Sequence, residues 1–189
     1  MYYPPYGYPN QPRNYWNGSM QHSAGNPTYQ PCPNGAMQAY PSHHNYFPYQ
    51  TAPTDYGPQP FVLNIDEATK QNNTFRTAIW TGTYLQATLM SLQPGESIGL
   101  EIHPDVDQFI RIEQGEGITQ MGKQKDRLDF QAAVAEDSAI FIPAGAWHNL
   151  TNTGRIPLKL YSIYAPPNHP FGTIHPTKAA AMAAEYGTE

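Results

Sequence analysis

Four residues in two short segments carry side chains that could together hold a metal ion. Glu101, His103 and Gln108 lie in one segment, and His148 lies in a second segment further along the chain. Two imidazoles and one carboxylate suit a divalent first-row transition metal and leave positions open for a substrate or water. A glutamine amide oxygen is a weak, neutral ligand, so we expect Gln108 to bind loosely or to orient a water. The predicted cofactor is therefore one divalent metal ion, with Fe, Mn, Ni and Zn all compatible with this ligand set.

The elements around these residues must bring them to one place. Alternate residues of a strand point to the same face, so a strand over residues 98–103 would turn Glu101 and His103 together. Gln108 opens the next expected strand, whose inward positions continue with isoleucines. His148 follows a Pro-x-Gly turn that could return it to the same cavity.

The chain after residue 60 has the pattern of an all-β protein. Short β-rich stretches alternate with turn signals, which is typical of an antiparallel sandwich or barrel. One or two helical turns are expected over residues 66–72, with Asp66 as the cap, and an Ala-rich helix over residues 177–185. The expected strands span residues 61–65, 75–81, 84–92, 98–103, 107–113, 117–121, 128–134, 139–142, 147–152 and 158–164.

The spacing of the two segments resembles the two motifs of the cupin superfamily, G-x5-H-x-H-x(3,4)-E-x6-G and G-x5-P-x-G-x2-H-x3-N. This chain reads Gly95-x5-Glu101-x-His103-x4-Gln108-x6-Gly115 and Asp137-x5-Pro143-x-Gly145-x2-His148-x3-Asn152. The resemblance implies a small double-stranded β-helix (jelly-roll) barrel with a metal inside.

Two positions depart from the family pattern. Glu101 stands where the family has its first histidine, and Gln108 stands where it has glutamate. The metal site would keep one carboxylate ligand, but that ligand would be Glu101, at the position of the family's first histidine. Asp105 and Asp107 are nearby carboxylates that we interpret as turn and rim residues.

The stretch around Glu101 is similar to small bacterial cupins labelled mannose-6-phosphate isomerase-like. This resemblance implies a metal-binding monocupin that acts on, or binds, a small oxygenated molecule such as a sugar or sugar phosphate. As an enzyme it would be an isomerase or a dioxygenase, with Glu101 as a candidate base. Gln86, Met90 and Trp147 are candidates to line the substrate pocket. The alternatives are a non-catalytic carbohydrate-binding module and a structural protein.

Residues 1–60 differ in composition from the rest of the chain. They contain no Leu, Ile or Val, and they hold 12 of the 20 prolines and 10 of the 14 tyrosines. Such a segment cannot bury enough apolar area to offset its conformational entropy, so we expect a disordered arm ahead of one folded domain, residues 61–189. The arm resembles the Tyr/Pro/Gly-rich tails of spore-coat proteins, which suggests coat or surface-assembly proteins as partners.

Charge and hydropathy exclude several classes of function. The net charge of −5 comes with no basic patch, which argues against a nucleic-acid partner. No apolar run approaches the roughly 20 residues that span a bilayer, and the N-terminus lacks a secretory signal pattern. We therefore expect a protein made in the cytoplasm, with the spore coat as an alternative destination.

Cys32 is the single cysteine, so no intramolecular disulfide can form. Small cupins commonly pair through an N-terminal strand, so residues 61–65 imply a homodimer.

Overall fold

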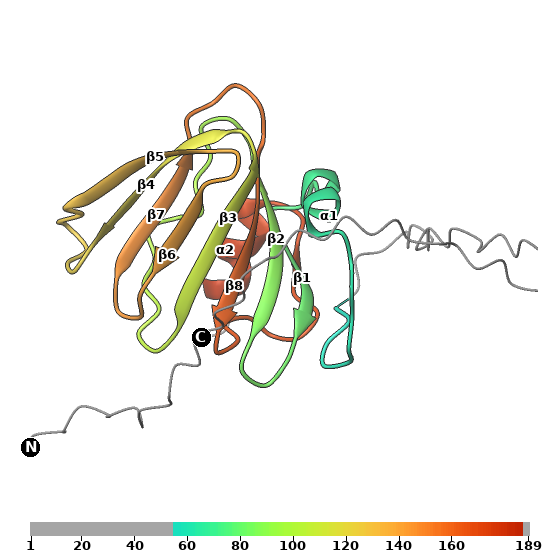
Figure 1. Cartoon of the computed structure of the whole chain (residues 1–189). Coiled ribbons are helices and arrows are strands. Elements are labelled where there is room, and N and C mark those ends of the chain that lie inside the picture. The colour runs from blue at the N-terminus through green and yellow to red at the C-terminus, as the bar shows by residue number, and fades with distance from the viewer. Residues whose placement is uncertain (1–54, 187–189) are drawn as a thin grey trace, which may run out of the picture. The chain divides into compact units, whose positions relative to one another are not determined.

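Two antiparallel sheets face one another in the computed structural model, which describes residues 55–186 (Figure 1). The larger sheet has the strand order β6-β3-β8-β2-β1-β9, and the smaller has the order β5-β4-β7. This is the all-β double-stranded β-helix expected from the sequence. Most of the predicted arm, including Cys32, lies outside the described residues. The strands are β1 (Arg76–Thr81), β2 (Gln86–Leu92), β3 (Asp107–Gln114), β4 (Glu116–Gly122), β5 (Phe130–Ala135), β6 (Ala139–Ile142), β7 (Trp147–Asn152), β8 (Leu158–Ala165) and β9 (Ile174–His175).

The inner face of the larger sheet is apolar at one end and polar at the other. Residues directly opposite each other on neighbouring strands share a face. Met90, Leu160 and Ile112 form one such row and are almost fully buried. Nearer the other end, the row of Gln86, Tyr164 and Gln108 is equally buried. The apolar end forms the core, and the polar end provides the surroundings of the candidate site.

The predicted strand over residues 61–65 is absent. Ile65 instead begins helix α1 (Ile65–Gln71), and the side chain of Asn64 accepts a hydrogen bond from the Glu67 amide at 3.2 Å. The cap is therefore Asn64 and not Asp66, which pairs with Lys70 inside the helix. Asn and Asp are similarly good N-caps, so the sequence alone did not separate them. The reason given above for a homodimer is consequently wrong, while the homodimer itself stays a prediction.

Residues 98–103 do not form a strand either. Only isolated bridges pair Ser97 with Thr151 and Glu101 with His148. Between them Gly99 has φ +102°, a conformation outside the extended region of a strand. The ladder is interrupted there, yet each bridge still fixes the segment against β7.

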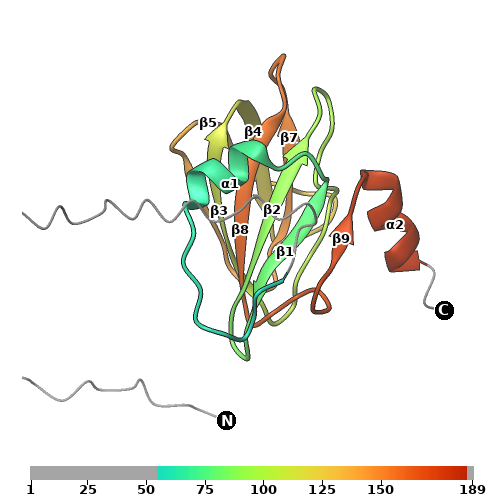
Figure 2. The same cartoon turned by 90° about the vertical axis from the view of Figure 1, so that its right-hand side faces the viewer.

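Both ends of the described chain pack against the sandwich. The expected domain start was residue 61, but Asp55 is buried, and its carboxylate accepts hydrogen bonds from Thr81 Oγ1 at 2.6 Å and from the Gly172 amide at 3.0 Å. The segment after β8 ends in β9, which pairs with β1. Helix α2 (Lys178–Tyr186) follows β9 at that edge (Figure 2). Within residues 55–186, no helix has the length and apolar character needed to cross a membrane.

Candidate metal centre

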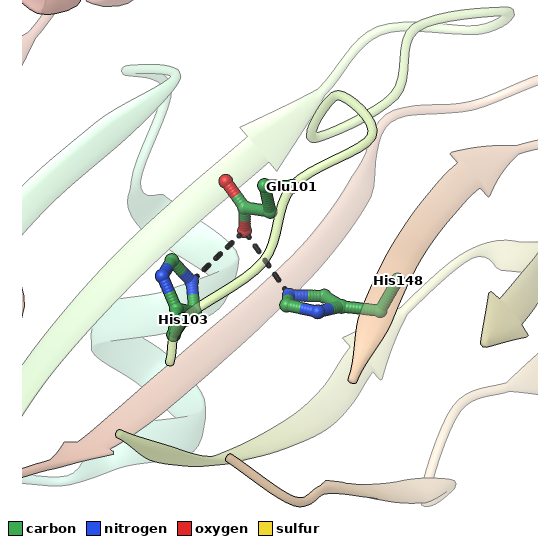
Figure 3. Close-up of side chains that lie close together, drawn as sticks. All are labelled: Glu101, His103 and His148. Atoms are coloured by element: carbon green, nitrogen blue, oxygen red, sulfur yellow. Dashed lines mark ion pairs between the residues drawn. The ribbon is translucent and has the colours of Figure 1, made fainter. Parts of the chain in front are cut away.

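Three of the predicted ligands converge between the two sheets (Figure 3). Glu101 Oε1 lies 3.4 Å from His103 Nε2 and 3.3 Å from His148 Nε2. The ligand atoms of the three residues all lie within 4.8 Å of one another. Glu101 and His103 come from the segment that precedes β3, whereas His148 comes from β7 of the smaller sheet. The candidate site therefore joins the two layers at the polar end.

Backbone hydrogen bonds hold these segments in register. The Glu101 amide donates to the His148 carbonyl at 3.0 Å, and the His148 amide donates to the Glu101 carbonyl at 2.9 Å. The Gly145 amide donates to the His103 carbonyl at 2.8 Å. Each histidine is thus tied by its own backbone to an element far away in the sequence. This pairing positions the ligands even though residues 98–103 form no continuous strand.

The carbonyl of Ala146 determines which nitrogen of His148 is protonated. It lies 2.9 Å from His148 Nδ1, and a carbonyl oxygen can only accept, so Nδ1 carries the hydrogen. The other ring nitrogen, Nε2, then faces Glu101 Oε1 at 3.3 Å. Neither His148 Nε2 nor His103 Nε2 has a hydrogen-bond partner among the described residues. Two imidazole nitrogens and a carboxylate that converge on one point suit a cation, and a carbonyl that orients a histidine is typical of metal sites.

The carboxyl group of Glu101 is ionised at neutral pH. Burial raises the pKa of Glu101, but the adjoining imidazoles of His103 and His148 lower it by more, so that the pKa is about 2. An ionised carboxylate is the form that binds a metal ion. A general base works best with a pKa near the working pH, so this low pKa favours a ligand role over the base role considered for Glu101.

Gln108 is placed to offer its oxygen. The side chain is buried, and its Nε2 donates to Ser162 Oγ at 2.9 Å. Its Oε1 has no hydrogen-bond partner among the described residues. Because Ser162 engages the nitrogen, the oxygen is left for a cation or a water, as a weak fourth ligand requires. Asp107 accepts from the Ala144 amide at 2.9 Å at the exposed rim, as its interpretation as a rim residue requires.

The three predicted lining residues have other contacts. Gln86 donates to the carbonyl of His169 and accepts from the His169 amide, so its side chain holds the segment after β8 in place. Met90 packs in the apolar core cluster. Trp147 is half-buried on the strand face opposite to His148, and Lys125 Nζ lies 5.4 Å from its ring centre.

Two aromatic residues near the site were not assigned to it from the sequence. The ring of His103 lies 5.8 Å from that of Tyr164, which lies 5.1 Å from that of His169. Burial lowers the pKa of His169 to about 3, so this imidazole is neutral at physiological pH. In the sequence, His169 and His175 lie six residues apart in a segment rich in Pro and Gly, and two such histidines fix no geometry. The sequence carries no local signal that would place His169 beside Tyr164.

Residues 88–164 match the cupin domain model. YrkC of Bacillus subtilis (strain 168) is 73% identical over 131 residues, which cover 69% of this chain and 70% of that protein. Protein L612 of Acanthamoeba polyphaga mimivirus is 46% identical over 117 residues, which cover 61% of this chain and 71% of that protein. The chain belongs to the cupin family. Among solved structures, BH2720 of Bacillus halodurans has 65% identity to this cupin and a TM-score of 0.68, covering 69% of this chain and 98% of its own.

The family membership and the side chains agree on a metal site. Cupins commonly bind a transition metal, and the cupin described here has a Glu/His/His set whose ligand atoms converge. Gln108 Oε1 is a buried oxygen with no hydrogen-bond partner among the described residues. The donor set is mixed nitrogen and oxygen, which suits a divalent first-row metal. The residues present therefore fit the group that the family implies.

Proposed function

We propose that this cupin binds one divalent transition metal through Glu101, His103 and His148, and uses it to bind and transform a small oxygenated molecule. The observation that carries the proposal is the convergence of two imidazole nitrogens and one carboxylate oxygen, which all lie within 4.8 Å of one another. The metal would supply a Lewis acid that polarises a carbonyl or hydroxyl oxygen of the ligand.

The chain's own residues would prepare the site for that chemistry. The Ala146 carbonyl accepts a hydrogen bond from His148 Nδ1 and so holds the ring in one tautomer. The Ser162 hydroxyl accepts from Gln108 Nε2, which leaves the Gln108 oxygen facing away from Ser162. The side chains of His148, His103 and Glu101 are only 1%, 11% and 20% exposed, so the site is largely shielded from bulk water. A shielded site strengthens the electrostatic interactions inside it.

A sugar or sugar phosphate is the substrate class that the family resemblance suggests, with an isomerase or a dioxygenase as the reaction. The buried polar side chains of Gln108, Ser162 and Tyr164 support a ligand with several oxygens. Turnover of sugar phosphates by the metal-loaded chain, followed by NMR, separates an isomerase from a binding protein. Oxygen consumption with the iron-loaded chain tests the dioxygenase.

The metal site is tested by measuring metal stoichiometry with mass spectrometry. We expect one ion per chain in the wild type after reconstitution with iron, manganese, nickel or zinc. His103→Ala and His148→Ala should each abolish binding, because three strong ligands are near the minimum for such an ion. Glu101→Gln should lower the stoichiometry by removing the carboxylate ligand, and Glu116→Gln, at an exposed glutamate outside the site, is its matched control and should keep full stoichiometry. Metal that survives both histidine substitutions, or none in the wild type with any of the four cations, would contradict the proposal.

A non-catalytic spore-coat or carbohydrate-binding protein, anchored through the Tyr/Pro-rich arm, is the alternative function. It is supported by the composition of the arm, most of which lies outside the described residues. Deletion of residues 1–54 with a localisation readout tests it. A chain that stays in the cytoplasm with and without the arm would contradict the coat alternative.

A further inference from the structure

A row of inward-facing side chains leads away from the candidate metal centre across the smaller sheet. Met121 on β4 lies directly opposite His148 on β7, and Phe130 on β5 lies directly opposite Met121. Opposed residues share a face, so all three point into the space between the sheets. Neighbouring strands are about 4.8 Å apart, which places Phe130 roughly 10 Å from His148 along the row.

The end of this row is uncovered. Phe130 points inward but is 53% exposed, whereas Val134 on the same face of β5 is only 8% exposed. The space between the sheets is therefore filled at Val134 and open at Phe130. An inward-facing phenylalanine that no side chain covers marks a place where another molecule can bury apolar surface.

A cavity of about 910 Å³ lies at this opening. Its wall is mainly apolar and includes Ala146, whose carbonyl lies 2.9 Å from His148 Nδ1, so one lining residue contacts a ligand of the candidate metal centre. The other apolar lining residues are Met121, Phe130, Phe141, Pro143 and Ala144.

The charges at the rim favour an anion. Arg127 and Asp129 pair with each other at 2.8 Å, so their charges offset. Lys123 also lines the cavity, and it has no ion-pair partner among the described residues. Asp107, beside the mouth, already accepts from the Ala144 amide, so the ammonium of Lys123 remains to attract an anionic ligand.

We propose that this cavity holds the body of the ligand, and that the ligand is an apolar carboxylate, or a related oxyanion, with a ring-sized body. Its oxygen end lies at Glu101, His103 and His148, and its ring lies against Met121 and Phe130. This proposal rests on the proposed metal site, and among small oxygenated molecules it favours an apolar carboxylate over the sugar phosphate that the family resemblance suggests. A sugar phosphate would place hydroxyl groups against these apolar side chains, where they would lack hydrogen-bond partners.

The test uses the full chain loaded with cobalt(II), whose visible absorption reports a ligand that reaches the metal. Acetate, benzoate, 2-naphthoate and glucose 6-phosphate are titrated separately. We expect 2-naphthoate to bind at least tenfold more tightly than acetate, with benzoate in between. Equal affinities for acetate and 2-naphthoate, or tighter binding of glucose 6-phosphate, would overturn the proposal.

The variant Phe130→Ala tests whether the preference for 2-naphthoate over acetate arises in the cavity. It should remove most of the preference for 2-naphthoate and leave the acetate affinity unchanged. Phe171→Ala is the matched control, because Phe171 is a comparably exposed phenylalanine, at 62%, that does not line the cavity. An unchanged preference in Phe130→Ala would refute the assignment.

A second readout separates failure of this inference from failure of the proposed function. A chain that binds no cobalt refutes the proposed function. The fluorescence of 2-naphthoate, measured with the metal-free chain, still tests the cavity by itself. We expect a spectral shift with the wild type and with Phe171→Ala, and its loss with Phe130→Ala. The absence of any shift with the wild type would show that the cavity does not take an apolar ring.

Discussion

The buried imidazole of His169 should make the folded state sensitive to mild acid. Burial is the main cause that lowers the pKa of this histidine from the usual 6.5 to about 3. Its ring packs edge-on against Tyr164, and its backbone amide and carbonyl are both hydrogen-bonded to Gln86. In the unfolded chain the same imidazole titrates near pH 6.5. Between these two pKa values the imidazole is protonated in the unfolded state and neutral in the folded state. The free energy of unfolding therefore falls as the pH is lowered.

The size of the effect follows from the two pKa values. At pH 7.5 both states are neutral at this residue, and the contribution is close to zero. At pH 4.5 the unfolded imidazole is two pH units below its pKa, while the folded imidazole is still neutral. Each unit corresponds to about 1.36 kcal/mol, so His169 alone should lower the free energy of unfolding by about 2.5 kcal/mol between pH 7.5 and pH 4.5.

Urea unfolding of the wild type and of His169→Gln at pH 7.5 and pH 4.5 measures the contribution of His169 to the free energy of unfolding. A chelator is present, so that metal binding does not contribute. Carboxylates and the other histidines titrate in both proteins, so the difference between the two pH dependences isolates His169. The wild type should lose about 2.5 kcal/mol more than His169→Gln, and Phe171→Ala in the same segment should behave as the wild type. A difference below about 0.5 kcal/mol, or a greater loss in His169→Gln, would refute the reasoning.

Three further predictions concern the core, the ligand set and the assembly. Asn152 is buried and donates to the carbonyls of Leu92 and Ile156, so Asn152→Ala should lower the free energy of unfolding by about 2–4 kcal/mol in urea titrations. Gln108→Glu should tighten metal binding by adding a carboxylate, whereas Gln108→Ala should cost little; competition with a chelator measures both. Light scattering on the full chain should give the mass of the homodimer that the family resemblance implies, and a monomer at micromolar concentration would contradict it.

The sequence by itself determined most of the strands and the candidate ligands. The alternation of apolar and polar residues predicts β1 to β8 to within a few residues, because side chains alternate between the two faces of a strand. The same periodicity places Gln108 on the inner face of β3 together with Ile110 and Ile112, and all three are buried. Motif spacing selected Glu101, His103 and His148, which the structure brings together.

Only the tertiary structure decided which distant segments meet. The bridge between Glu101 and His148 replaces the strand expected over residues 98–103. The contact of His169 with Tyr164 depends on how the segment after β8 returns over the sheet, which no local pattern encodes. The exposure of Phe130 depends likewise on what the opposite sheet leaves uncovered. Periodicity reports which face a residue occupies, whereas contacts between distant segments depend on the packing of the two sheets and of the connections between them, and so these features appear only in the folded chain.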